Sequence, residues 1–191
     1  MKKAVALALT TLFASSAFAG ATDPGFYVGG GFGLTESKLD NLDYAFLPSL
    51  KGDRAFKVYG GYQFNRIVAL EGGYTKYGKF SDSHLNGYSW NPSALSLAAN
   101  LGYTFDIGLR PFATLGLSYL GLNEEGYKAF ENDSGSAFRY GLGLEYAPQQ
   151  IDGLAVRMAY EADAFSVQEP INGTSTTFSV GSFYLGASYK F

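Results

Sequence analysis

The chain has 191 residues, 47% of them hydrophobic, and a formal net charge of −3, values that fit a single domain and give no support to nucleic-acid binding. It contains no cysteine, which excludes a disulfide framework and the attachment of a lipid through a thiol. No stretch after residue 19 supplies about 18 consecutive apolar residues, so an inner-membrane helix is also excluded.

The first 19 residues have the pattern of an export signal. Lys2 and Lys3 precede an apolar run over 4–13 that is too short to span a bilayer, and Ala17 and Ala19 form a small-x-small cleavage pattern. We therefore expect a cleaved signal peptide at 1–19 and a mature chain of one domain, 20–191, that begins at Gly20.

Eight segments follow in which bulky apolar residues occupy alternate positions. They span residues 25–35, 54–64, 67–77, 93–105, 109–119, 137–146, 153–163 and 178–191. The connections are alternately long and short: 36–53, 65–66, 78–92, 106–108, 120–136, 147–152 and 164–177. Outer-membrane barrels have antiparallel strands of about ten residues, short periplasmic turns and longer external loops. The sequence thus predicts an all-β protein, an eight-stranded antiparallel up-and-down transmembrane β-barrel.

Alternate positions of these strands separate into two faces of different chemistry. One face, with Phe32, Leu70, Leu117 and Leu185 among its members, carries no charge, as contact with lipid requires. The other face holds five bases, four acids and many Gly, Ala and Ser residues. A soluble, lipocalin-like barrel would instead turn its bulky face inward. Because an eight-stranded lumen is only wide enough for side chains, the charges of the inner face are expected to pair with one another.

Several segments resemble a known family. They are FYVGGGFG at 26–33, YGGYQF at 59–64, LEGGY at 70–74, YGLGLEY at 140–146 and YKF at 189–191. Together they resemble the eight-stranded OmpA-type outer-membrane barrels, and OmpX-like proteins and opacity-type adhesins share much of this pattern. The resemblance covers the whole mature chain and implies location in the outer membrane, in contact with lipid and lipopolysaccharide.

The resemblance also implies how the protein is assembled and how far it extends. The terminal aromatics Tyr189 and Phe191 resemble the signal that the outer-membrane assembly machinery recognises, with periplasmic chaperones as earlier partners. Long members of the OmpA type continue into a peptidoglycan-binding domain, whereas this sequence stops at Phe191. We therefore expect a stand-alone barrel.

The resemblance to OmpA-type barrels implies a charged gate inside the barrel. In that type the gate is built from acids on strands three and six, a lysine on strand four and an arginine on strand seven. Glu71, Glu145 and Arg157 match three of these positions, but strand four carries Asn100 and no inward lysine. This difference favours a fixed pairing of Arg157 with both glutamates over a switching gate. A second layer of charges, nearer the outside, is expected to join Lys57, Arg139 and Glu161.

Enzymatic activity is not expected. Some small outer-membrane barrels are acyltransferases, deacylases or proteases, which need a histidine with a serine or aspartate partner placed at a strand end. The only histidine, His84, follows Asp82 and Ser83 in a long loop, and adjacent residues of an irregular loop do not form a triad. No ligand spacing resembles a calcium site, and no cofactor is expected.

Two functions fit the sequence. In the first, the protein is a structural barrel that stabilises the envelope and presents four external loops for adhesion or other surface contacts, including a host ligand, while a salt-bridge network closes its interior. The alternative is a narrow porin or a channel for small hydrophobic solutes.

Overall fold

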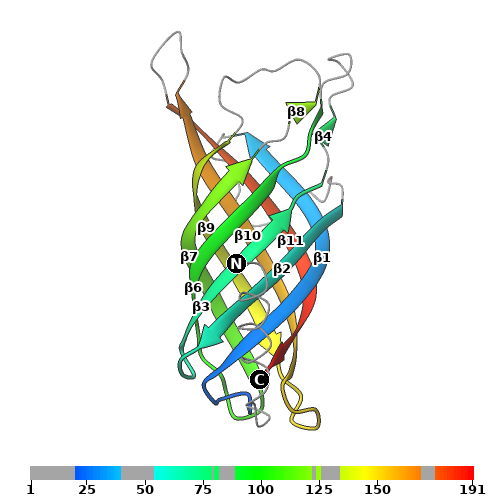
Figure 1. Ribbon diagram of the computed structural model, residues 1–191, viewed down its shortest axis with the longest axis vertical. Helices are drawn as coiled ribbons and strands as arrows, with labels where there is room; N and C mark the ends of the chain where they lie inside the picture. Colours follow the sequence, from blue (N-terminus) through cyan, green and yellow to red (C-terminus); the bar gives the residue numbers. More distant parts are fainter. Residues whose placement is uncertain are drawn as a thin grey trace, which may run out of the picture.

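The computed structural model describes residues 20–39, 54–78, 80–81, 89–121, 124–125, 134–168 and 175–191. Eight long strands make up the wall: β1 (Gly25–Leu39), β2 (Arg54–Gln63), β3 (Val68–Lys76), β6 (Ser93–Gly102), β7 (Leu109–Gly121), β9 (Ser134–Tyr146), β10 (Leu154–Gln168) and β11 (Ser175–Lys190). They form a closed antiparallel barrel in the order β1-β11-β10-β9-β7-β6-β3-β2, with the strands strongly tilted around a long axis (Figure 1). The predicted fold class is confirmed.

No helix in the described part of the chain is long and apolar enough to cross a membrane.

The barrel closes where the first long strand meets the last. The β1–β11 pairing runs from Tyr27 opposite Lys190 to Leu39 opposite Phe178. At its lower end the amide of Phe191 donates to the carbonyl of Phe26 at 2.8 Å. Closure pairs both edges of the sheet, which satisfies the backbone polar groups where water is absent.

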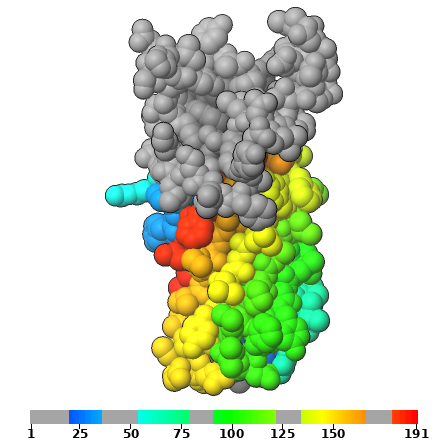
Figure 2. Space-filling model, turned by 180° about the vertical axis from the view of Figure 1, so that it is seen from behind, coloured from blue at the N-terminus to red at the C-terminus, as the bar shows by residue number. Residues whose placement is uncertain are grey.

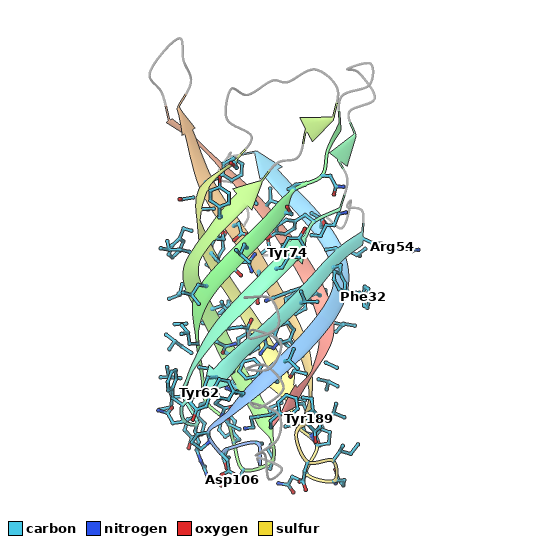
Figure 3. All side chains as sticks on the ribbon, in the orientation of Figure 1. Phe32, Arg54, Tyr62, Tyr74, Asp106 and Tyr189 are labelled. Atoms are coloured by element: carbon cyan, nitrogen blue, oxygen red, sulfur yellow. The ribbon has the colours of Figure 1, made fainter. Side chains whose placement is uncertain are left out.

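The two faces of the wall have the chemistry that the alternation predicts. Phe32 and Leu117 are 73% and 68% exposed, and the labelled Phe32 points away from the barrel (Figure 3). Lys57 and Arg139, on the opposite parity, are buried in the lumen. In the space-filling view from behind, the outward side chains of successive strands form oblique bands around the wall (Figure 2). An apolar outside around a charged inside rules out the soluble, lipocalin-like alternative.

The strand ends differ from the predicted ones mostly at the long-connection end. We predicted a loop over 164–177, but β10 continues to Gln168 and pairs with β11 from Ser175 onward. Thr176 and Thr177 are β-branched and favour strand geometry, so this hairpin extends beyond the predicted boundary. β1, β7 and β9 are also longer at this end than predicted. Three short strands, β4 (Phe80–Ser81), β5 (Ser89–Trp90) and β8 (Glu124–Glu125), form a small separate sheet within the predicted loops 78–92 and 120–136.

The short turns lie at the other end, close to the predicted positions. Asn65 accepts hydrogen bonds from the amides of Ile67 and Val68 at 2.8 and 2.9 Å. Gly108, with φ of 83°, closes the second turn in a conformation that favours glycine. Arg66 links the first turn to the second through an ion pair with Asp106 at 2.8 Å. Tyr103 and Phe105 are exposed at this end, with ring centroids 5.0 Å apart, as in the aromatic girdles of outer-membrane barrels.

Candidate functional site: the charged lumen

The lumen contains a continuous chain of ion pairs. It passes from strand to strand in the order Glu145, Arg157, Glu71, Lys57, Glu161, Arg139 and Asp163. The strands that supply these residues, β2, β3, β9 and β10, lie on different sides of the barrel, so the chain crosses its interior. All six residues predicted for the charge network belong to this chain.

Arg157 joins the two glutamates at the short-turn end. Its Nη1 lies 2.7 Å from Oε2 of Glu71, and its Nη2 lies 2.8 Å from Oε2 of Glu145. Glu145 is directly opposite Arg157 in the β9–β10 register, whereas Glu71 reaches it across the lumen. The guanidinium also lies against the rings of Tyr59 and Phe112, at 4.3 and 4.9 Å from their centroids. Two carboxylates and two rings thus fix the orientation of a planar cation.

Lys57 connects the two predicted layers. Its Nζ lies 3.2 Å from Glu71 and 2.6 Å from Glu161. The hydroxyl of Tyr184 donates to Glu161 at 2.8 Å and that of Tyr27 donates to Glu71 at 2.9 Å. The layers that we predicted as separate therefore form one network, in which the carboxylates also accept hydrogen bonds from neutral donors.

The upper part of the network is centred on Arg139 and Asp163. The Nε and Nη2 atoms of Arg139 donate to the two carboxylate oxygens of Asp163 at 2.8 and 2.6 Å, a bidentate arrangement. Tyr77 and Ser118 donate to the same carboxylate, at 2.5 and 2.7 Å. Glu161, the predicted partner of Arg139, lies farther away at 3.6 Å. Asp163 is thus the main partner of Arg139, and our predicted network lacked it.

An apolar layer adjoins the upper end of the network, toward the long connections. Its buried members come from β6, β7, β9 and β11 and from the residue that follows β3: Tyr77, Ala94, Leu120, Ala137 and Val180. Tyr77 donates its hydroxyl to Asp163, and Val180 lies opposite Asp163 in the β10–β11 register, so the layer packs directly against the charged chain.

Two cations near the short-turn end do not belong to the chain of ion pairs. Nη1 of Arg110 donates to Oδ1 of Asn100 at 2.7 Å, so an amide on strand β6 contacts an arginine from the neighbouring strand. Nζ of Lys190 donates to the carbonyls of Ala21 and Asp23, at 3.0 and 2.9 Å. Neither cation has a carboxylate within 4.0 Å among the described residues.

The other predicted site residues lie outside the charged network. The rings of Tyr189 and Phe191 pack edge to face with centroids 5.1 Å apart, at the end of the barrel that carries the short turns. His84 and the predicted signal peptide 1–19 lie outside the described residues. The part of the chain that the structure describes contains no group of three or more His, Asp and Glu side chains suited to a metal.

Comparison with known proteins identifies the class to which this barrel belongs. Residues 5–191 match the family described as the outer membrane protein beta-barrel domain. The chain belongs to this outer-membrane β-barrel family. As a member of the family, it resides in the outer membrane, and its short turns are assigned to the periplasmic side. No curated protein is found that matches the sequence.

Solved structures of other outer-membrane barrels have the same fold. Neisserial surface protein A is 17% identical, with a TM-score of 0.61 over 88% of this chain and 99% of that one. Ail, the attachment invasion locus protein of Yersinia pestis, solved with the heparin analogue sucrose octasulfate, is 20% identical, with a TM-score of 0.55 over 88% and 99%. OprG from Pseudomonas aeruginosa is 15% identical, with a TM-score of 0.55 over 90% and 98%. At these identities the likeness concerns the fold of this outer-membrane barrel alone.

Proposed function

We propose that this protein is a non-conducting, non-enzymatic structural barrel of the outer membrane that stabilises the envelope and presents its external loops for adhesion or other surface contacts. The observation that carries the proposal is the continuous chain of ion pairs across the lumen. Its members are all paired, and all except the half-buried Glu145 are buried. Lys57 and Arg157 each bind two carboxylates on different strands. Opening a path for ions would require several of these contacts to break together, at a cost of several kcal/mol for each uncompensated charge.

The apolar layer supports the same proposal. Tyr77, Leu120 and Val180 fill the lumen with buried side chains beside the Arg139–Asp163 end of the network. Hydrophobic constrictions of this kind close pores by excluding water. With a charged network and an apolar layer packed against it, the lumen is suited to rigidity rather than to transport.

A specific role, in this proposal, belongs to the external loops. The predicted loops 36–53, 78–92, 120–136 and 164–177 contain ten acidic residues and four lysines. A polyanion such as the heparin analogue in the Ail structure would be repelled by this charge. A basic surface on a partner protein fits the loops better, because complementary charge steers association.

Conductance across planar bilayers tests the closed lumen. The wild-type protein is expected to show little or no conductance, and Arg157→Ala is expected to conduct more because it removes the side chain that joins Glu71 to Glu145. An open wild-type channel that does not respond to this substitution would favour the narrow porin or small-solute channel instead.

Deleting the four loops one at a time and measuring cell or ligand binding tests the surface role, with barrel folding checked on gels as a control.

A further inference from the structure

A cavity of about 250 Å³ opens at the short-turn end of the barrel, below the chain of ion pairs. Its deep wall includes Arg110, Glu145, Arg157 and Lys190, and its mouth is formed by residues 20–22 and the turn 147–153. A space of this size holds an ion as large as phosphate together with several water molecules.

The charges around this cavity are unbalanced. Among the side chains that the structure describes, the inner wall of the barrel carries five cations, Lys57, Arg110, Arg139, Arg157 and Lys190, against the four carboxylates Glu71, Glu145, Glu161 and Asp163. The four carboxylates all bind Lys57, Arg139 or Arg157 within 4.0 Å. The two cations left without such a partner, Arg110 and Lys190, both line the cavity.

Arg110 provides a second, independent sign of a ligand. It is 3% exposed, and its Nε has no hydrogen-bond partner among the described residues. Both described acceptors of its guanidinium belong to Asn100, so the group has more donors than acceptors. A buried cation with too few acceptors costs free energy, and an anion that contacts the guanidinium from the cavity would be stabilising. Glu145 lies opposite Arg110 in the β7–β9 register, but it pairs with Arg157 through Oε2 and forms no ion pair with Arg110 within 4.0 Å.

The remaining acids of the cavity lie toward its mouth. Asp106 is held by Arg66 at 2.8 Å, and Asp152 is exposed in the turn. The deep part therefore keeps an excess of positive charge, with a planar donor on one strand and an ammonium group on another.

We propose that the periplasmic cavity is a binding site for a small inorganic oxyanion, held by Arg110 and Lys190. The anion accepts hydrogen bonds from the guanidinium of Arg110 and the ammonium group of Lys190, and it neutralises the excess charge of the lumen. This inference is independent of whether the barrel conducts, because the site is reached from the periplasmic side without crossing the network of ion pairs.

Inorganic phosphate is the probe for the test. The whole mature protein is refolded in an uncharged maltoside detergent, and phosphate is titrated at constant ionic strength near neutral pH, with binding followed by phosphorus NMR and by the melting temperature. Wild-type protein is expected to bind one phosphate saturably and to melt at a higher temperature when phosphate is bound. Arg110→Gln and Lys190→Gln should each weaken binding about ten-fold, the loss typical of one charge-assisted contact.

Lys76→Gln is the matched control, since it removes one positive charge from an exposed side chain outside the cavity, at the other end of the barrel. Its phosphate affinity should equal that of the wild type. Arg110→Gln removes an unpaired buried charge, so the variant is expected to fold. Absence of saturable phosphate binding to wild-type protein overturns the proposal, as does equal affinity in Arg110→Gln and wild type.

Discussion

Lys57 and Glu161 are separated by 104 positions in the sequence, yet Nζ of Lys57 donates to Oε2 of Glu161 at 2.6 Å in the middle of the lumen. Their strands, β2 and β10, are not neighbours in the wall, because β1 and β11 lie between them. The ion pair thus joins two sides of the barrel directly, and the network to which it belongs links the strands independently of the backbone ladder.

Arg157→Ala should destabilise the barrel by about 3 to 5 kcal/mol, because it leaves the buried Glu71 and the half-buried Glu145 without their shared cation. Urea unfolding in micelles measures this loss. Adding Glu71→Gln and Glu145→Gln in the same chain should recover part of it, since the stranded charges are then removed. Arg54→Ala is the control: Arg54 points outward at the rim (Figure 3), so its removal should change stability by less than about 0.5 kcal/mol. Equal stability of Arg157→Ala and wild type would show that the pairing contributes nothing.

Asp163→Asn tests the upper part of the network. The substitution preserves shape but removes the charge that accepts from Arg139, Tyr77 and Ser118, so a loss of about 3 to 5 kcal/mol is expected in the same unfolding assay. Asp106→Asn is the matched control, because its ion pair with Arg66 is exposed to solvent and should contribute less than about 1 kcal/mol. An equal loss of unfolding free energy in Asp163→Asn and Asp106→Asn would show that the buried pairing of Asp163 has no special role in stability.

Gly116→Ala should destabilise the barrel strongly, although it adds only one methyl group. A Cβ at this inner position of β7 would lie 2.5 Å from the Cα of Ala98 on the neighbouring strand β6, so the wall must shift to accept it. Overpacking of this kind costs about 1 to 3 kcal/mol. Gly135→Ala makes the same change in β9, where a Cβ would meet no atom within 4 Å, and should be tolerated. Thermal unfolding of both variants in one detergent provides the comparison, and equal melting temperatures would contradict it.

Deletion of Phe191 should reduce outer-membrane assembly in cells far more than stability in vitro. The resemblance assigns Tyr189 and Phe191 to an assembly signal. In the structure, the amide of Phe191 donates to the carbonyl of Phe26, and its ring contacts that of Tyr189 at the end of the barrel. Quantifying the protein in outer-membrane fractions and its urea midpoint after refolding separates the two effects. Phe191→Tyr keeps the aromatic end and should assemble normally. Wild-type outer-membrane levels of the truncated chain would rule out the signal.

Alternation along single strands was enough to predict the barrel wall. In β2, for example, it correctly placed Phe56 outside and Lys57 inside. The partners across the lumen were harder to predict, because they depend on how far each strand is shifted along its neighbours when the sheet closes. The alternation places Asp163 on the inner face. It could not show that the main partner of Arg139 is Asp163 and not Glu161. Tyr77 was assigned to a strand end, and nothing in its local sequence indicates that its hydroxyl reaches β10.

The contact between β1 and β11 has a consequence for folding kinetics. Every other pair of neighbouring wall strands is consecutive along the chain among the wall strands, but β1 and β11 are the first and the last of the eight. Their pairing must therefore wait until β11 is available, and closing so large a loop slows folding. Until that step, the growing sheet has two unpaired edges and an exposed apolar face in aqueous surroundings, which favours aggregation. The time between synthesis of β1 and docking of β11 is thus the period in which the chain depends most on protection from water and from other copies of itself.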